Sequence, residues 1–261
     1  MDKFISDRKK EVISTVFKHK NPKILKTSNI ILLIMSEKPE IKKFYGDLAG
    51  DTYLREIRRF GLRYDEMVDT LVGLLSLTSP TDILDIGCGV GNIDEAVFQT
   101  VPGCNITCVE LSPEMVDVAR KRLGQYGEDK LKIVCSDILE YEPDKKYDAI
   151  FSNLAIHNLP LEDKKIVLRK VRDWLKPEGV FIWGDFMDWG DTEVSKYFME
   201  YRRQKVLESG ASEQFVDEVF KKEAQDYRLT VVETVDLLRE AEFEPEVLWA
   251  YSFLSIFRAK K

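Results

Sequence analysis

The sequence feature that most constrains the fold is the stretch from Ile83 to Asn92, which reads ILDIGCGVGN. An apolar run ending in three alternating glycines, Gly87, Gly89 and Gly91, predicts a buried strand that turns sharply into a helix. Glycine lets backbone amides approach a ligand where a side chain would collide, and the helix expected near Gly91 adds free amides of its own. The stretch therefore predicts a nucleotide-type cradle.

Two details indicate which kind of nucleotide the cradle suits. The dinucleotide fingerprint G-x-G-x-x-G places its third glycine at position 92, which is Asn92 here. Asp85 lies at the mouth of the cradle, where a carboxylate repels a pyrophosphate and attracts a cationic ligand. S-adenosylmethionine carries a sulfonium and an ammonium group and no phosphate, so it fits a glycine loop with an acidic lip.

Polar side chains also follow the next predicted strands. The strand at residues 105–110 ends in Glu110, where nucleotide-binding folds place an acid that grips the ribose hydroxyls. A strand at 131–135 runs into Ser136-Asp137-Ile138, and one at 147–151 runs into Ser152-Asn153-Leu154. Because the carboxyl ends of parallel strands meet at one edge of a sheet, we expect the ligand site along that edge.

Together these residues resemble the class I, Rossmann-like S-adenosylmethionine-dependent methyltransferases. The matching motifs are D-I-G-C-G-V-G at 85–91, the acid Glu110, S-D-I at 136–138, S-N-L-A-I-H-N-L at 152–159 and the turn L-K-P-E-G at 175–179. The resemblance implies an α/β, doubly wound fold: a mostly parallel, seven-stranded sheet with an antiparallel last strand, plus a helical N-terminal segment and an insertion that form a lid. It also implies S-adenosylmethionine as the cofactor and a small-molecule acceptor, since the N-P-P-Y motif of base- and glutamine-methylating relatives is lacking.

The resemblance further implies which residues contact the cofactor. In the family, the glycine loop and its acid face the methionine moiety, the next acid holds the ribose, and the residues after the second and third strands enclose the adenine. The corresponding positions are Asp85, Gly87, Cys88, Gly89 and Gly91, then Glu110, then Leu111, Ile138 and Asp137, which faces the adenine amino group, with Tyr64 and Asn153 as further contacts. Tyr64 is expected either to approach the methionyl carboxylate or to pack in the core at the start of a helix.

Two side chains near this edge are candidates for catalysis. Methyl transfer from a sulfonium is an in-line displacement, which needs an aligned nucleophile and, for some acceptors, removal of a proton. His157 is one candidate base because histidine titrates close to working pH; its alternative role is to order a loop or the methionyl end of the cofactor. Asp185, at the end of the fifth strand, is the other candidate, and its alternatives are substrate binding and surface hydration.

The chain is expected to divide around this core. Residues 1–78 form an N-terminal helical lid, residues 79–190 the cofactor-binding core, and residues 191–228 a helical substrate cover. Residues 229–261 supply a last helix and strands that complete the core.

The lid segments leave several roles open. Residues 4–18 have an apolar helical face that packs on its own domain, forms a homodimer contact or covers the substrate. Arg58 and Arg59 face either an acidic substrate group or solvent. Five aromatic residues of the insertion either line an apolar pocket or pack its two helices together: Tyr197, Phe198, Tyr201, Phe215 and Phe220.

Composition and charge disfavour other classes of protein. A net charge of −7 over 261 residues argues against an extended nucleic-acid surface, whose affinity depends on neutralising phosphates. The cysteines, Cys88, Cys104, Cys108 and Cys135, lack paired metal-ligand spacing, so we expect reduced thiols in a cytoplasmic protein and no metal. A signal-peptide pattern is lacking, and the apolar burst at 29–35 is shorter than the roughly twenty residues of a membrane span.

Two other functions remain compatible with the sequence. The tail from Val232 to Trp249 resembles carboxy-S-adenosylmethionine synthase, a methyltransferase-fold enzyme that modifies the cofactor. Such enzymes hold the additional carboxylate with an arginine of the substrate-covering region, and the matching place, Phe220-Lys221-Lys222, has none. A non-catalytic S-adenosylmethionine-binding protein is the other alternative, although its expected sign, a damaged cofactor motif, is absent.

Overall fold

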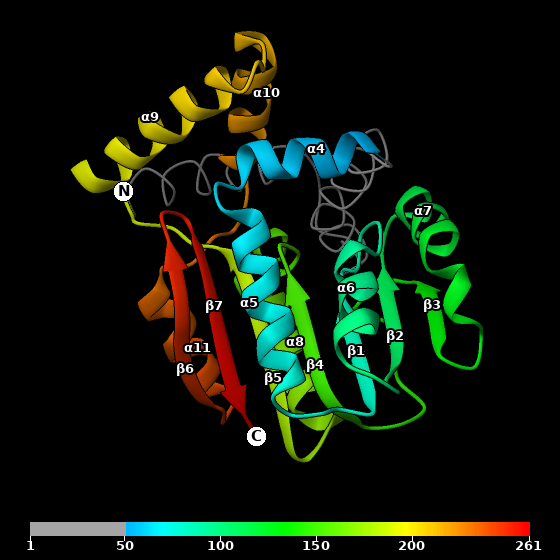
Figure 1. Cartoon of the computed structure of the whole chain (residues 1–261). Coiled ribbons are helices and arrows are strands. Elements are labelled where there is room, and N and C mark those ends of the chain that lie inside the picture. Colours follow the sequence, from blue (N-terminus) through cyan, green and yellow to red (C-terminus); the bar gives the residue numbers. More distant parts are fainter. Residues whose placement is uncertain (1–50) are drawn as a thin grey trace, which may run out of the picture. The chain divides into compact units, whose positions relative to one another are not determined.

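The computed structural model describes residues 51–261, in which helices and strands alternate through most of the chain (Figure 1). The helices are α4 (Asp51–Phe60), α5 (Tyr64–Ser76), α6 (Asn92–Thr100), α7 (Pro113–Leu123), α8 (Leu161–Trp174), α9 (Glu193–Glu208), α10 (Glu213–Glu223) and α11 (Val231–Glu240), with short 3-10 turns η1 (Gly124–Tyr126) and η2 (Ile156–Asn158). The strands are β1 (Asp82–Ile86), β2 (Asn105–Glu110), β3 (Leu131–Cys135), β4 (Tyr147–Asn153), β5 (Leu175–Phe186), β6 (Glu244–Tyr251) and β7 (Leu254–Lys260). The helix expected at 4–18, with its dimer alternative, lies outside the described residues.

The strands form one seven-stranded sheet in the order β3-β2-β1-β4-β5-β7-β6. All neighbouring pairs from β3 to β5 are parallel, whereas β7 runs antiparallel to both β5 and β6. This confirms the doubly wound, mostly parallel sheet with an antiparallel last strand. The strand order reverses between β1 and β4, and open α/β sheets bind ligands at such a reversal, beyond the carboxyl ends of the strands.

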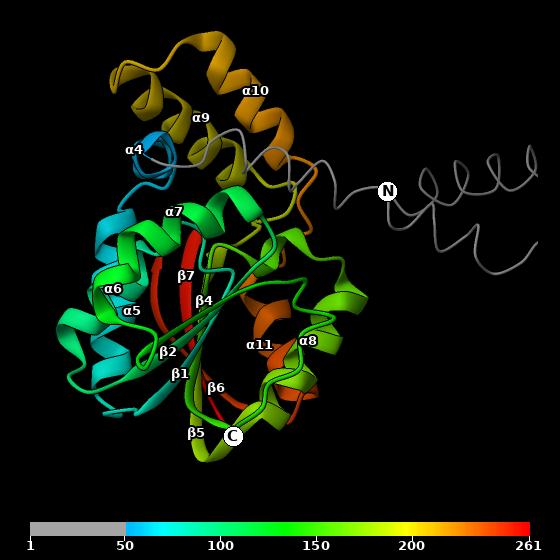
Figure 2. The same ribbon diagram turned by 90° about the vertical axis from the view of Figure 1, so that its right-hand side faces the viewer.

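Helices cover both faces of the sheet (Figure 2). On one face, α5 and α6 bury apolar residues such as Met67, Leu71 and Val97 in a single cluster. On the other face, α8 and α11 bury a second cluster that includes Val171 and Leu238. The central strands therefore have apolar side chains on both faces, which is why they read as continuous apolar runs.

Local signals in the sequence set where helices begin. The Ser112 hydroxyl accepts the Met115 amide, and Pro113 takes the first helical position of α7. Thr230 and Glu233 form the expected capping box at the start of α11. Gly91, with φ of +74°, precedes α6 and turns the chain from β1 into that helix.

A helical cap lies beyond the carboxyl ends of the parallel strands (Figure 1). It consists of α4, before the sheet in sequence, and of α9 and α10, the insertion after β5. Phe60, Val206, Val216 and Val219 form its own small apolar cluster. Within residues 51–261, we find no helix with the length and apolar character required to cross a membrane.

Candidate active site

A glycine loop joins β1 to α6 and leaves open space at one of its residues. Apart from its chain neighbours, a Cβ atom added at Gly89, whose φ is +54°, would meet nothing closer than Tyr53 Cε1 of α4, 4.0 Å away. A Cβ at Gly87 would lie only 2.4 Å from the Cβ of Ala155, so this glycine allows two loops to pack closely. The loop therefore offers a ligand access at Gly89, while Gly87 packs it against the segment that follows β4.

Glu110 ends β2 beside this loop. One carboxylate oxygen accepts the Gly89 amide at 3.0 Å, and the other accepts the Ser112 amide at 2.8 Å. Burial raises the pKa of the Glu110 carboxyl, although the amides of Ser112 and Gly89 oppose that rise. Because each carboxylate oxygen has a second acceptor position, Glu110 can fix the loop and accept ligand hydroxyls at the same time.

Asp85 and Tyr64 are buried next to the loop. The Tyr64 hydroxyl accepts a hydrogen bond from the Asn92 side-chain amide at 3.0 Å, and burial raises the pKa of Tyr64 to about 12. Asp85 is 2% exposed, and its Oδ1 has no hydrogen-bond donor among residues 51–261. Such a carboxylate needs a proton, a cation or an external donor. An unpartnered acid beside an open glycine loop fits a cationic nucleotide such as S-adenosylmethionine.

The residues expected to enclose the adenine follow the neighbouring strands β2 and β3. The Ser136 amide donates to the Glu110 carbonyl at 2.9 Å, which holds the two loops together. Leu111 and Ile138 are half-buried there, and Asp137 Oδ1 accepts an amide two residues further along the chain at 3.0 Å. The structure thus brings these four expected contacts to one edge of the sheet.

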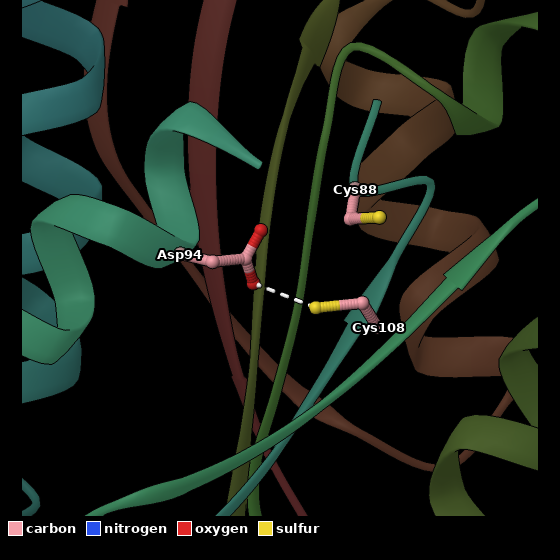
Figure 3. Close-up of side chains that lie close together, drawn as sticks. All are labelled: Cys88, Asp94 and Cys108. Carbon is pink, nitrogen blue, oxygen red and sulfur yellow. Dashed lines mark hydrogen bonds between the residues drawn. The ribbon is translucent and has the colours of Figure 1, made fainter. Parts of the chain in front are cut away.

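Two other expected contacts, Cys88 and Asn153, are buried. The Asn153 side chain lies against β5, because a Cβ added at Gly184 would be 2.5 Å from Asn153 Oδ1. The Cys88 sulfur lies within 4.8 Å of the Cys108 sulfur on β2 (Figure 3). Both side chains are therefore directed toward neighbouring strands.

His157 and Asp185 form a hydrogen-bonded pair where β4 and β5 end. His157 Nδ1 lies 2.5 Å from Asp185 Oδ1, and the carboxylate also accepts the His157 amide, the Trp183 indole and the Phe186 amide. Burial alone would raise the pKa of the Asp185 carboxyl, but the charge and hydrogen bond of His157 lower it overall. An ionised Asp185 places the ring proton on Nδ1, so Nε2 is the nitrogen that can accept a proton.

Lys164 of α8 anchors the loop that carries His157. Its ammonium group donates to the backbone carbonyls of His157, Leu159 and Tyr227, and the residue is 1% exposed. Burial lowers the pKa of Lys164 to about 8, although three nearby carboxylates favour the charged form. Nothing in the local sequence pattern singles out Lys164, because its three acceptors are backbone groups that only the fold brings together.

An apolar pocket lies between His157 and the cap. It encloses about 610 Å³ of empty space, part of it open to solvent. The three acids in it, Glu56, Glu223 and Asp226, each pair with a basic side chain. The lining residues are Tyr53, Glu56, Ile57 and Phe60 of α4, Leu154 and His157 after β4, Phe186 of β5, and Phe215, Val219, Lys222, Glu223 and Asp226 in or just after α10.

A buried arginine, Arg202 of α9, joins the three helices of the cap. Its Nε donates to the Phe60 carbonyl of α4 at 2.6 Å, and its terminal nitrogens bind the two Glu223 oxygens of α10 at 2.7 and 2.6 Å. The guanidinium also lies 5.1 Å from the ring centre of Phe186 and 5.0 Å from that of Phe220. Since Arg202 is 1% exposed, this ion pair is shielded from water and connects the cap to the end of β5.

We expect Arg202→Lys to lower the free energy of unfolding by about 2 kcal/mol, because an ammonium cannot make the bidentate contact and leaves a buried acceptor unsatisfied. The matched control is Arg203→Lys, whose ion pair with Asp217 lies at the surface and whose effect should stay within about 0.5 kcal/mol. Urea titrations measure both. Equal losses in the two variants would contradict the role given to Arg202.

The two arginines expected to face either a substrate or solvent are occupied by other residues of the chain. Arg58 binds Asp65 at the surface, at 2.9 Å. Arg59 binds Glu56, at 3.2 Å. Neither guanidinium lines the pocket within the described part of the chain.

The five aromatic residues of the insertion differ in what they contact, and only Phe215 lines the pocket. Phe215 lines the pocket, and Phe220 packs against Phe60 at a ring-centre distance of 6.1 Å. The other three contact one another along α9 outside the pocket lining, and are Tyr197, Phe198 and Tyr201.

Comparisons with known proteins agree with this geometry. Residues 84–181 match a family model described as "Methyltransferase domain". The chain is 32% identical over 123 residues to a malonyl-[acyl-carrier protein] O-methyltransferase of Acetivibrio thermocellus, covering 46% of this chain and 42% of that one. It therefore spans less than half the length of that relative.

Other similarities extend over more of the chain. A phosphoethanolamine N-methyltransferase of Plasmodium falciparum is 27% identical, over 84% of this chain and 80% of that one. A carboxy-S-adenosyl-L-methionine synthase of Klebsiella pneumoniae is 24% identical, over 80% and 87%. The solved structure of N-methyltransferase NodS from Bradyrhizobium japonicum shares the fold, with a TM-score of 0.60 at 17% identity over 86% and 98% of the two chains.

The sheet order, the glycine loop and the family match agree on one assignment. Strands β1 to β4 and most of β5 lie inside the matched residues 84–181, apart from the first two residues of β1. Residues 84–181 match a methyltransferase domain, and the fold is that of the class I, Rossmann-like S-adenosylmethionine-dependent methyltransferases.

Proposed function

We propose that this chain transfers the methyl group of S-adenosylmethionine to a small-molecule acceptor. The observation that carries the proposal is the continuity of two sites: the glycine loop below Tyr53 of α4, and the apolar pocket that Tyr53 also lines. A cofactor at Gly89 and an acceptor beside His157 would be neighbours. Reaction between two bound molecules gains most from such alignment.

We propose distinct roles for the residues of each site. Glu110 holds the ribose hydroxyls, Leu111 and Ile138 flank the adenine, and Asp137 faces its amino group. When bound, the cofactor supplies an activated methyl group. In the pocket, His157 Nε2 accepts a proton from the acceptor, and Asp185 fixes the ring through Nδ1. The cap helices α4, α9 and α10 exclude water from the pocket.

The first test is binding of S-adenosylmethionine by the purified chain. A ligand that binds only the folded state at one hundred times its Kd stabilises that state by about 2.7 kcal/mol, so the melting temperature should rise measurably. Transfer of labelled methyl groups to a panel of small molecules then identifies the acceptor. An unchanged melting curve from demonstrably folded protein would overturn the proposal.

We expect Glu110→Gln to weaken S-adenosylmethionine binding by about 10-fold to 100-fold, because an amide offers the ribose one acceptor in place of two charged ones. Calorimetry measures the affinity. Asp117→Asn, at an exposed position on the following helix α7, serves as the control and should bind as the unmodified chain does. If the Glu110→Gln variant bound S-adenosylmethionine with unchanged affinity, Glu110 would not be a cofactor-binding residue.

The synthase alternative requires an arginine that can bind a carboxylate. Arg202 and Arg228 both approach the pocket, but both bind Glu223. Among residues 51–261, no arginine lines the pocket. This favours methyl transfer, and mass spectrometry of a co-purified ligand would separate the two activities. Cofactor binding without methyl transfer to any acceptor would favour the non-catalytic alternative.

We further propose that the protein works in the cytoplasm and without nucleic acid. All four cysteines are free thiols, as expected in a reducing compartment. The net charge of −7 disfavours phosphate backbones as partners.

A further inference from the structure

The charged side chains of the pocket between His157 and the cap are compensated within the protein. Among residues 51–261, each charged residue that lines the pocket pairs with an opposite charge. The pairs are Glu56 with Arg59 at 3.2 Å, Glu223 with Arg202 at 2.6 Å, and Asp226 with Lys222 at 3.3 Å. The side chains of the three acids are between 5% and 13% exposed, so these pairs are largely shielded from water.

These ion pairs disfavour a charged acceptor. In an apolar pocket, the charge of the acceptor would lose its hydration, and the side chains just named would offer it no free counter-charge. An acceptor that took a partner from one of the pairs would leave the other member of that pair buried and uncompensated. The pocket therefore suits an uncharged acceptor.

Aromatic rings make up much of the remaining lining. They belong to Tyr53 and Phe60 of α4, His157, Phe186 of β5 and Phe215 of α10. Phe60 meets Phe215 edge to face, with ring centres 5.7 Å apart and planes at 86°. His157 meets Phe186 in the same way, at 5.7 Å and 88°. Because aromatic rings favour edge-to-face and offset stacked contacts with one another, this lining suits an aromatic ligand.

His157 is arranged to receive a proton. The Asn158 side-chain nitrogen lies 3.1 Å from His157 Nε2, and it also donates to the Ala155 carbonyl at 3.1 Å. Because the carbonyl fixes the amide nitrogen as a donor, Nε2 meets it as an acceptor, and the ring proton lies on Nδ1 next to Asp185. A second carboxylate oxygen, Asp226 Oδ2, lies 3.9 Å from Nε2 and favours the charged ring once it has taken up a proton.

A neutral imidazole base narrows the class of acceptor. A carboxylate acceptor has no proton to give, and an aliphatic amine is charged at neutral pH, as lysine is with its pKa of about 10.4. An aliphatic hydroxyl holds its proton almost as tightly as water, whose pKa is about 15.7. A phenolic hydroxyl is uncharged, and its pKa of about 10 is close enough to the imidazole value of about 6.5 for proton transfer as the new bond forms.

We propose that the acceptor is an uncharged aromatic compound that presents a phenol-type hydroxyl to His157 Nε2. The inference rests on the proposed function, since it takes this pocket to be the acceptor site. The hydroxyl takes the place of the Asn158 amide at Nε2. Its oxygen forms a bond to the methyl carbon while the bond from that carbon to sulfur breaks, and the electron pair of the broken bond stays on sulfur. The hydroxyl proton passes to Nε2, and the charged ring is then flanked by Asp185 and Asp226.

The test measures kcat/KM for transfer of labelled methyl groups from S-adenosylmethionine to matched compounds. The uncharged phenols are 4-methylphenol and 2-naphthol, and their charged partners are 4-hydroxybenzoate and 6-hydroxy-2-naphthoate, which carry a carboxylate on the same ring system. Benzyl alcohol and benzylamine represent aliphatic hydroxyls and ammonium groups. We expect the better uncharged phenol to exceed every other class by at least about 100-fold, because the others bring a charge into the pocket or hold their proton too tightly.

Asp226→Asn tests whether the ion pairs cause this preference. The substitution takes the charged partner from Lys222, so the ratio of kcat/KM between a phenol and its carboxylate partner should fall about tenfold. A general loss of activity cancels in this ratio. Asp217→Asn, at an exposed position of α10 whose partner is Arg203, is the matched control and should keep the ratio of the unmodified chain.

Transfer to a charged compound that equals or exceeds transfer to the phenols would overturn this inference and leave the proposed function intact. So would transfer to none of the phenols by folded protein that binds S-adenosylmethionine, or an unchanged ratio in Asp226→Asn. Failure of folded protein to bind S-adenosylmethionine would overturn both.

Discussion

The His157→Gln variant should lose about 10²-fold to 10⁴-fold in kcat, the usual contribution of a positioned general base, while it binds S-adenosylmethionine as tightly as the unmodified chain. The reason is geometric: His157 lines the acceptor pocket and Asp185 holds its Nδ1, so Nε2, which lies 3.1 Å from the Asn158 side-chain amide, is the nitrogen that can take up a proton. Glutamine preserves a polar side chain there but cannot take up a proton. The measurement is single-turnover transfer of labelled methyl to the acceptor that the unmodified chain modifies.

The internal control for this variant is its cofactor affinity, which should not change because His157 is assigned to the acceptor side. A kcat within threefold of the unmodified value would mean that alignment of the two molecules suffices and that His157 has a structural role. A loss of cofactor binding would instead support the alternative in which His157 orders the methionyl end of the cofactor.

Asp185→Asn should lower the free energy of unfolding by about 3–5 kcal/mol at neutral pH, because it leaves buried hydrogen-bond donors without their charged acceptor. The carboxylate accepts four hydrogen bonds, two from His157 and one each from Trp183 and the Phe186 amide. The side-chain oxygen of asparagine can accept only some of these four hydrogen bonds. Its NH2 group cannot accept any, so the remaining donors would be left without an acceptor. Denaturant titration measures the loss, and Asp173→Asn, exposed on α8, should stay within about 0.5 kcal/mol.

The pH dependence of this contribution follows from its sign. Because the pKa of Asp185 is lower in the folded chain than its usual value, its contribution is fully present above the unfolded pKa of about 3.9 and is lost as pH falls through the folded value. The gap in unfolding free energy between the unmodified chain and Asp185→Asn should therefore narrow only below about pH 4. A gap that closed near pH 6 would assign the effect to another group.

The cofactor edge of this fold is predictable from sequence because its signals are local. The glycine loop, Glu110 at the end of β2 and the capping box at Thr230 and Glu233 each lie within a few residues of the element they define. The antiparallel position of β7 follows from resemblance to a family and is confirmed here. Local pattern and fold agree wherever a single element decides the outcome.

The interior of the cap is not predictable in this way. Arg202 binds Phe60, from which it is separated by 142 positions, and no periodicity connects the two. The burial of Asp94 is not predictable from its sequence position either, because an acid in the first turn of a helix normally indicates an exposed side chain that interacts favourably with the helix dipole. Its burial against Asp85 appears only when β1 and α6 are placed in space.

Arg202 also limits how such a chain can be re-engineered for a new acceptor. The cap residues that line the pocket come from two separate stretches, one before β1 and one between β5 and β6, and the Arg202 guanidinium joins these stretches. A chimera that takes only α9 and α10 from another enzyme would leave a buried group without its partner. That group would be either the Phe60 carbonyl, without its hydrogen-bond donor, or a new charged side chain, without its counter-ion. We therefore expect a chimera to acquire a new acceptor specificity only when residues 51–60 and residues 193–223 are exchanged together.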